Sequence, residues 1–178
     1  MSKIKISLQE FTNALQEIIS LPWWRIIHPS AGWLFIDIGK SYQDYISGKN
    51  GKEKLYVRGI YQINIKGNWY IKKNEEVIGS RNVGKNETQK EYFDRMESIV
   101  NNFPIKFVIS IKFENEKLVF EANDDYKICV SLPKDADSLS FTKVELDKNN
   151  KPINYTHWRY SEDLKSLAKI ESEQITIQ

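Results

Sequence analysis

The sequence has very little of the residues that most often carry catalysis and cross-linking, with one cysteine and two histidines among 178 residues. A single cysteine cannot form a disulfide within the chain, which fits a reducing cytosol. Cys129 lies in the apolar run YKICVSL, so we expect a buried structural thiol. The sequence has no apolar run of about 18 residues, the length that a membrane span needs, and its first residues do not resemble a signal peptide. We therefore expect a cytoplasmic protein.

The sequence also lacks a strong excess of one charge, because 26 basic residues stand against 24 acidic ones. A formal charge of +2 gives no broad cationic surface, so we expect neither nucleic acid nor a membrane as the partner. The charges are nevertheless uneven. Residues 40–58 hold five basic and two acidic side chains, and residues 112–125 hold two basic and five acidic ones. These segments predict either two patches of opposite sign or an ordinary solvated surface.

No spacing of residues matches a known catalytic, nucleotide or metal site. His28 and His157 do not belong to a metal-binding motif, and the glycines do not have the spacing of a phosphate-binding loop. We expect no cofactor, no metal and no enzymatic activity. One alternative remains open, in which the two histidines meet in space and perform acid–base chemistry, as in metal-independent ribonucleases. Asp37 lies within an apolar strand and needs a partner, for which Arg25 or Arg58 is available.

The periodicity of apolar residues predicts one helix and one strand near the start. Residues 7–20 have a helical apolar stripe, and Ser7 and Glu10 have the spacing of a capping box. Residues 32–38 alternate as a strand, with Leu34, Ile36 and Ile38 on the core side. Gly39 is expected to end this strand, and the glycines and charges of residues 41–54 predict a flexible loop.

The rest of the chain predicts mainly strands. Residues 55–71 indicate two strands around a turn at 66–68, residues 87–103 a second helix with Tyr92 or Phe93 in its stripe, and residues 105–160 several strands in succession. The fold class is α+β, mainly an antiparallel sheet, either a sandwich or a half-barrel, with an N-terminal helix and a second helix between strands. We expect a single domain over residues 1–178, with its core at about 7–160 and a C-terminal extension at 161–178 that contains a short helix over 161–170.

The order of these pieces resembles a widespread group of small uncharacterised bacterial β-rich proteins. The segments that carry the resemblance are LPWW, AGWLFIDIGK, GIYQINIKGNWYI, VIGSRN, LVFEANDDYKICVSLP and HWRY, within about residues 20–160. Several positions differ from the group's pattern: Ile38-Gly39 stands for Phe-Gly, and Trp69-Tyr70-Ile71 for Trp-Arg-Ile. The sequence also resembles, in the same loose way, immunity proteins of polymorphic or contact-dependent growth inhibition toxin systems. This resemblance implies a compact β-rich domain that neutralises a toxin, with no catalytic residues to transfer.

The leading hypothesis is a non-catalytic cytosolic protein that binds a cognate toxin domain through aromatic and charged surface residues. Trp23 and Trp24 cannot both point inward, so one of them is expected at the surface. The alternatives are a small nuclease or toxin-type enzyme that uses a histidine, and a β-domain that binds a small apolar ligand. The candidate partner-binding residues are Trp23, Trp24, Lys49, Lys52, Lys54, Arg58, Glu114, Glu116, Asp124 and Asp125.

Overall fold

The protein is described from a computed structural model that covers residues 3–27, 32–47, 53–101, 106–131, 138–161 and 166–173. The helices are α1 (Leu8–Leu15), which continues into one 3-10 turn, η1 (Gln16–Ile18), and α2 (Gln89–Asn101). The strands are β1 (Lys3–Ile6), β2 (Pro22–Ile27), β3 (Leu34–Ser47), β4 (Glu53–Lys66), β5 (Trp69–Lys73), β6 (Glu76–Ser80), β7 (Lys106–Glu114), β8 (Lys117–Ala122), β9 (Tyr126–Ser131), β10 (Ser138–Leu146), β11 (Pro152–Ser161) and β12 (Ser166–Glu173).

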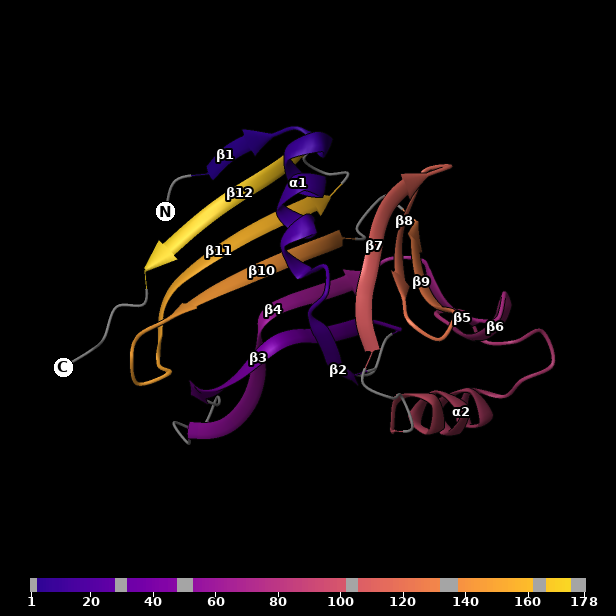
Figure 1. Ribbon diagram of the computed structural model, residues 1–178. Coiled ribbons are helices and arrows are strands. Elements are labelled where there is room, and N and C mark those ends of the chain that lie inside the picture. The colour runs from indigo at the N-terminus through magenta and orange to yellow at the C-terminus, as the bar shows by residue number, and fades with distance from the viewer. Residues whose placement is uncertain are drawn as a thin grey trace.

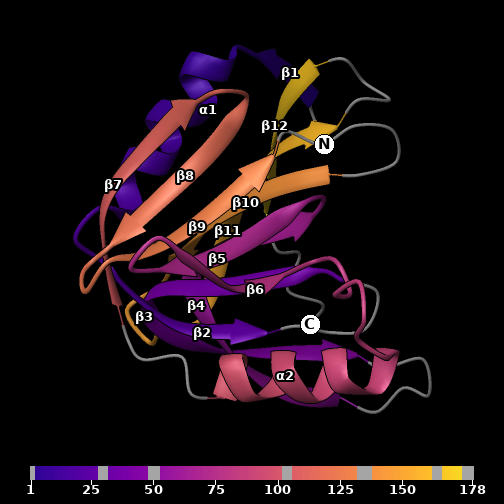
Figure 2. The same ribbon diagram turned by 90° about the vertical axis from the view of Figure 1, so that its right-hand side faces the viewer.

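All strands belong to one antiparallel sheet with the order β1-β12-β11-β10-β4-β3-β2-β7-β8-β9-β5-β6. The link between β2 and β7 is short, with Pro22 opposite Phe107 and Trp23 opposite Lys106. The sheet turns at this link, so that β7-β8-β9-β5-β6, the second half-sheet, lies over the first half-sheet, β1 to β2 (Figures 1 and 2). This arrangement confirms the predicted α+β class and its mainly antiparallel sheet.

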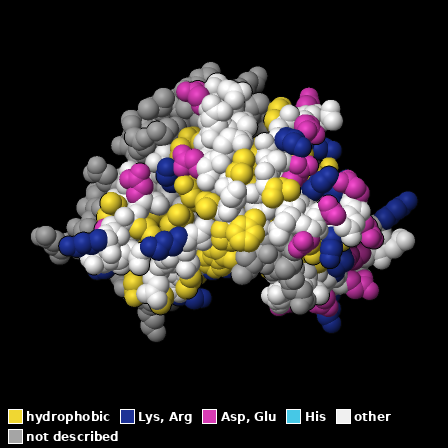
Figure 3. Space-filling model, in the orientation of Figure 1, with side chains coloured by type: hydrophobic (Ala, Val, Ile, Leu, Met, Phe, Trp, Pro, Cys, Tyr) yellow, Lys and Arg dark blue, Asp and Glu magenta, His cyan; other side chains and the backbone are white. Residues whose placement is uncertain are grey.

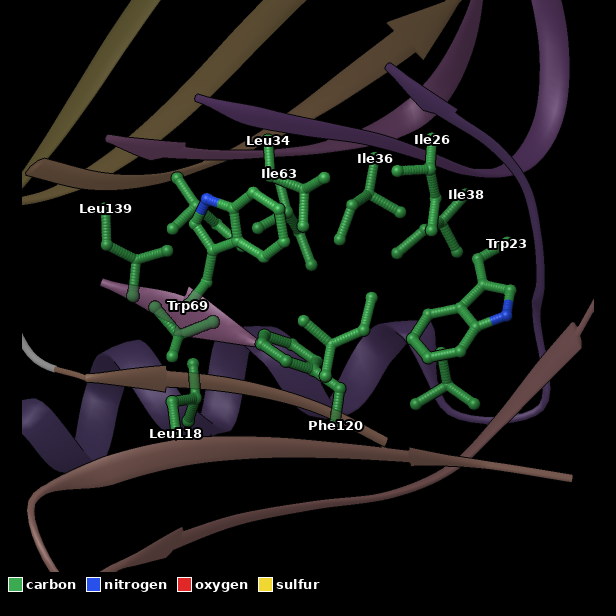
Figure 4. Packing of buried hydrophobic residues seen from close by; sticks show 14 of the residues in the cluster. Trp23, Ile26, Leu34, Ile36, Ile38, Ile63, Trp69, Leu118, Phe120 and Leu139 are labelled. Atoms are coloured by element: carbon green, nitrogen blue, oxygen red, sulfur yellow. The ribbon is translucent and has the colours of Figure 1, made fainter. Parts of the chain in front are cut away.

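The core fills the space between the two half-sheets. Leu34, Ile36 and Ile38 of β3 point toward Phe120 of β8 and Trp69 of β5, and all five are almost fully buried (Figure 4). Burying one large apolar side chain contributes about 1.5–3 kcal/mol to stability. The alternation in residues 32–38 therefore predicted the correct core face of β3.

Helix α1 begins with the predicted capping box. The Glu10 backbone N–H donates to Ser7 Oγ at 3.2 Å, and the Ser7 backbone N–H donates to the Glu10 carboxylate at 2.6 Å. Phe11, Leu15 and Ile18 form the apolar stripe and are buried in the core cluster. The α-helix itself is shorter than expected, because the chain tightens into η1 after Leu15 and leads directly to β2.

Helix α2 has the same kind of start, which the sequence analysis did not identify. The Thr88 backbone N–H donates to Glu91 at 2.8 Å, and Glu91 N–H donates to Thr88 Oγ1 at 3.3 Å. Tyr92 and Met96 are buried, whereas Phe93 is exposed, which decides between the two predicted stripes in favour of Tyr92. Within the described ranges, neither α1 nor α2 is long and apolar enough to cross a membrane.

Two expectations for residues 39–71 are wrong. Gly39 does not end the strand, and most of the predicted flexible loop at 41–54 consists of β3 up to Ser47 and β4 from Glu53. The two strands predicted around 66–68 are present as β4 and β5, but they do not pair with each other, since β4 pairs with β3 and β10 while β5 pairs with β6 and β9. The two-residue period predicts that a segment is a strand, but it does not identify the neighbour of that strand.

In β7, Val108 and Ile111 are buried while Phe107 and Ile109 are exposed, with a register shift between Val108 and Ser110. One further expectation fails toward the end of the chain. The short C-terminal helix at 161–170 is replaced by β12, which pairs with β11 and with β1. Pairing with an open sheet edge satisfies backbone groups along the whole segment, and this tertiary gain outweighs a local helical preference.

Candidate protein-binding surface

The outer parts of β3 and β4 form a two-stranded projection, which we name the ribbon (residues 40–47 and 53–60). Within the ribbon, β3 pairs with β4 from Ser41 opposite Gly59 to Ser47 opposite Glu53. The ladder between β2 and β3 stops at Ile38, and the ladder between β10 and β4 stops at Tyr61. Among the described residues, each strand of the ribbon therefore pairs only with the other. A two-stranded ribbon is marginally stable alone, so this segment depends on the sheet from which it extends.

A β-bulge separates the ribbon from the rest of the sheet. Gly39 and Lys40 on β3 stand opposite Ile60 alone on β4, and Gly39 has a φ of 77° in the left-handed region. A bulge of this kind bends the strand and increases its twist. The strands also approach closely at Gly59, where an added Cβ would lie 2.6 Å from the backbone N of Ile38. The positions of Gly39 and Gly59 therefore determine where the ribbon turns away from β2.

Asp37 fixes this bend from the face opposite the core. Its carboxylate accepts the Gly59 backbone N–H at 2.8 Å and pairs with Arg25 at 2.6 Å, with only 2% of the Asp37 side chain exposed. The indole N–H of Trp24 donates to the carbonyl of Gly39 at 2.9 Å, and the Arg25 guanidinium lies 5.3 Å from the Trp24 ring. The prediction that Arg25 or Arg58 pairs with Asp37 is confirmed for Arg25.

One face of the ribbon exposes large apolar side chains. Tyr45 is 61% exposed, Leu55 45% and Val57 44%. Tyr45 stands directly opposite Leu55, and Gln43 stands opposite Val57, so the apolar side chains share one face. Hydrophobic side chains gather over β2–β4 in the middle of the face shown in Figure 3, whereas both charge signs cover the part built by the second half-sheet.

The opposite face of the ribbon is basic and aromatic. The Lys54 ammonium lies 5.3 Å from the Tyr56 ring and the Arg58 guanidinium 5.6 Å from it. Arg58 Nε is buried and has no hydrogen-bond partner among the described residues. Tyr42 lies beside Arg58 on the adjacent strand, and burial, more than any nearby charge, raises the pKa of its phenol well above the ordinary 10.0. This face carries two cations that no carboxylate of the described residues pairs.

A groove of about 750 Å³ lies between the ribbon and the turn that joins β10 to β11. Ile153, which is 50% exposed, lines it on the side of the turn. The turn itself is held by Asp147, whose carboxylate accepts the backbone N–H groups of Asn149 at 2.7 Å and Lys151 at 2.9 Å. The lining residues are Ser41, Tyr42, Gln43, Asp44, Tyr45, Val57, Asp147, Asn149, Asn150, Lys151, Pro152 and Ile153.

The predicted acidic patch at residues 112–125 is not one patch. Glu114 and Glu116 lie at the β7–β8 turn, and Asp124 and Asp125 lie at the β8–β9 turn. The six residues of β8 separate these two turns, which corresponds to about 20 Å along a strand. All four side chains are exposed, but the structure does not bring them together.

Between these turns, the outer face of the second half-sheet carries charges that are paired with one another. Glu75 contacts Lys72 at 3.0 Å and also Lys127, and these hydrogen bonds lower the pKa of its carboxyl to about 2. Glu121 contacts Lys112 at 3.0 Å and accepts a hydrogen bond from Ser110. The hydrogen bond from Ser110, followed by that from Lys112, lowers the pKa of Glu121. This face is therefore a network of satisfied ion pairs.

The contacts of His157 are those of a residue that stabilises the fold. Its Nδ1 lies 2.9 Å from Thr142 Oγ1, its ring stacks on Tyr155 at 6.1 Å, and burial lowers the pKa of the imidazole below the ordinary 6.5. His28 lies outside the described residues, so the predicted pairing of the two histidines stays a hypothesis. Within the part of the chain that the structure describes, no group of three or more His, Cys, Asp or Glu side chains has the arrangement of a metal site. Cys129 is a buried free thiol, as predicted.

The structure places the other predicted contact residues as follows. Trp23 is fully buried beside the core, so its assignment as a partner contact is wrong, and Trp24 is half-buried at the bulge. Lys54 and Arg58 lie on the ribbon, whereas Lys49 and Lys52 lie outside the described residues. The apolar face of the ribbon was not predicted. Leu55 and Val57 fall in the predicted strand segment and alternate with Lys54, Tyr56 and Arg58, which was the available signal, whereas Tyr45 falls in the segment 41–54 that was predicted to be a loop.

Comparison of the chain with family models, with curated proteins and with solved structures finds no match. The resemblance of its segments to small bacterial β-rich proteins and to immunity proteins therefore stays a prediction.

Proposed function

We propose that this protein is a non-catalytic cytoplasmic binding protein that neutralises a cognate bacterial toxin domain by direct contact through the ribbon. The observation that carries the proposal is the exposure of Tyr45, Leu55 and Val57 on one face of a projection whose outer edges pair with none of the described strands. Exposed large apolar side chains gathered in one place mark sites of protein–protein interaction. Tyrosine in particular provides a large contact area at low entropic cost.

The charges of the ribbon support a protein partner with an acidic rim. Lys54 is exposed and Arg58 half-exposed, and neither is neutralised by a described carboxylate. Unpaired charges around an apolar centre increase the rate of association with a partner of opposite sign and select against partners of like sign. The outer face of the second half-sheet lacks this combination, because its lysines and glutamates already pair with one another.

The groove favours a protein partner over a small apolar ligand. Most of the side chains that line it are polar, including Ser41, Gln43, Asp44 and Asn149. Pockets for small apolar molecules are lined predominantly by apolar and aromatic side chains. A polar groove next to an exposed apolar strip is typical of the rim and centre of a protein interface.

The proposal is tested by producing the chain together with the toxin domain encoded by the neighbouring reading frame. We expect a complex that survives purification and that protects cells expressing the toxin domain. The triple variant Tyr45→Ser, Leu55→Ser, Val57→Ser should weaken binding about a hundredfold or more, because contacts at an interface centre commonly cost more than 1 kcal/mol each. Protection of the cells should fall with the affinity.

A matched triple variant controls for the loss of exposed apolar area. Val77, Val83 and Ile109 are 53%, 45% and 58% exposed and lie outside the ribbon, so changing all three to serine should leave the affinity unchanged. Thermal unfolding of both triple variants verifies that they fold. Absence of binding together with absence of protection would exclude the proposed function. Equal affinity of the two triple variants would exclude the ribbon as the surface.

A further inference from the structure

We infer that the partner binds by strand addition, with an extended segment of its chain joining the open edge of β3 inside the groove. This inference rests on the proposed function and specifies the part of the partner that the surface accepts. The segment has a basic side chain opposite Asp44 and apolar side chains on either side of it. Backbone hydrogen bonds then provide affinity, and alternate side chains provide specificity.

The lining of the groove shows that an edge of β3 faces it. Five consecutive residues of β3, from Ser41 to Tyr45, line the groove, although neighbouring side chains of a strand point to opposite faces. A groove that contacted one face of the strand would be lined by alternate residues. Only Val57 represents β4 in this lining, so the edge that faces the groove is the one opposite the β3–β4 ladder.

This edge has backbone groups that the described residues of neighbouring strands do not pair. The β2 ladder reaches only Ile38, and the bulge at Gly39 and Lys40 turns the following residues away from β2. An open strand edge presents alternate N–H and C=O groups and is a ready template for another strand. The other wall of the groove is the β10–β11 turn, which Lys40 joins through a hydrogen bond to Asn150. The groove therefore lies between the open edge of β3 and the β10–β11 turn, which is hydrogen-bonded to β3.

Charge identifies the segment that fits. Asp44 is half-buried in the groove and has no ion pair or hydrogen bond with another described residue. Tyr42 and Tyr155 lie near enough for the Asp44 charge to raise the pKa of both phenols, although burial is the larger cause for each. Asp44 stands opposite Tyr56 and shares its face with Lys54 and Arg58, but neither cation forms an ion pair with it among the described contacts. A lysine or arginine of the added strand would lie on the other side of Asp44 and would neutralise this charge. Residues before and after it would point to the other face, where Tyr45 is exposed.

The same charges disfavour a second copy of this chain as the occupant. Two β3 edges that paired antiparallel about Asp44 would place two carboxylates directly opposite each other, which is destabilising. A partner protein that supplies an apolar–basic–apolar strand avoids this conflict.

A blocked peptide of sequence Ser-Thr-Val-Arg-Val-Thr-Ser is the probe for this inference. We expect NMR titration of the full chain to show binding, with slower hydrogen exchange at alternate amides between Lys40 and Ser47. Replacement of the peptide's arginine by glutamate should weaken binding about tenfold or more, and Asp44→Asn in the protein should remove most of the difference between the two peptides.

N-methylation of the peptide backbone distinguishes strand addition from side-chain contact alone. In an added strand, the N–H groups of alternate residues point toward the template. N-methylation at the arginine and N-methylation at the two valines should therefore have different effects on binding. One should abolish binding and the other should leave it unchanged. Equal effects of the two methylations, or no binding of the unmodified peptide, would overturn the inference.

The outcome is separable from that of the proposed function. If the toxin domain binds through Tyr45, Leu55 and Val57 but alternate amides of β3 gain no protection in that complex, strand addition is wrong and the proposed function stands. If light scattering shows a dimer of the free chain in which those amides are already protected, a second copy occupies the edge and the inference is also wrong.

Discussion

The inner and outer halves of β3 and β4 are joined by one continuous ladder, yet they differ in almost every other respect. In the inner half, residues 35–38 pair with β2 as well as β4, and Ile36, Ile38, Ile63 and Ile65 are buried. In the outer half, each strand has one neighbour among the described strands, and Tyr45, Leu55 and Val57 are exposed. The same type of apolar side chain thus stabilises the fold on one side of the bulge and is available to a partner on the other.

The comparison shows that neighbours, rather than the strand itself, determine the role of an apolar residue. β4 keeps its alternation past the bulge, so Val57 and Leu55 lie on the same face of the strand as Ile63, but they are exposed where Ile63 is buried. A residue that is apolar and unpacked contributes little to stability, because burial supplies the hydrophobic gain. Its presence on the ribbon therefore needs another reason, and contact with a partner provides one.

The strongest test of this comparison is a pair of substitutions on β4. Ile63→Ala should lower the free energy of unfolding by about 3 kcal/mol, because it removes buried carbon and leaves a cavity. Leu55→Ala should change it by less than about 0.5 kcal/mol, because Leu55 is exposed. Urea denaturation of both variants and the wild type measures the difference. Equal losses of unfolding free energy in the two variants would show that Leu55 is packed in the ribbon and would contradict the difference between the inner and outer halves.

The second prediction concerns the junction between the halves. Asp37→Ala should lower the free energy of unfolding by about 2–3 kcal/mol, because it leaves the Gly59 N–H and the partly buried Arg25 without their acceptor. Asp37→Asn keeps an acceptor for Gly59 and should lose less. The measurement is again urea denaturation, and a loss as large in Asp37→Asn as in Asp37→Ala would assign the whole effect to the ion pair.

The third prediction tests the close approach of the strands at the bulge. Gly59→Ala should cost about 2 kcal/mol, because its Cβ would lie 2.6 Å and 2.7 Å from backbone atoms of Ile38. Gly79→Ala is the control, since its Cβ would meet the flexible side chain of Ile99 at 3.2 Å. Differential scanning calorimetry should show a clearly larger decrease in the melting temperature for Gly59→Ala. A larger decrease for Gly79→Ala would contradict the account of the bulge.

The smallest expected effect is the pH dependence of stability that arises from His157. Burial lowers the pKa of His157 in the folded protein, so the unfolded chain takes up a proton first as the pH falls below the ordinary value of 6.5. Stability should therefore decrease from pH 7.5 to pH 5.5, and His157→Gln should decrease less. Urea midpoints at both pH values measure this. Identical pH dependence of the two proteins would show that His157 is not the titrating group.

Local patterns were sufficient for several features. The Ser7–Glu10 capping box, the buried side of residues 34–38 and the Asp37–Arg25 pair followed from spacing and from the cost of an unpaired buried charge. The failures share a different origin. Gly39, which was expected to end the strand after Ile38, is the site of a bulge, and a single sequence does not distinguish a bulge glycine from a turn glycine.

The candidate surface was predicted only in part. Lys54 and Arg58 were selected from the local excess of positive charge, and both lie on the ribbon. The acidic residues were selected by the same reasoning, but they lie at opposite ends of β8. The charge composition of a segment does not show how the chain folds within it. The prediction of a charged patch was therefore useful for the basic residues of 40–58 and wrong for the acidic residues of 112–125.

Local sequence patterns are enough to specify an α+β chain with mainly antiparallel strands and a capped first helix, because these features depend on side chains a few residues apart. The identity of neighbouring strands, the turn of the sheet at β2 and β7, and the apolar residues that stay uncovered become visible in the three-dimensional structure alone. These features depend on contacts between distant segments, and alternation specifies two faces of a strand without specifying what will cover either of them.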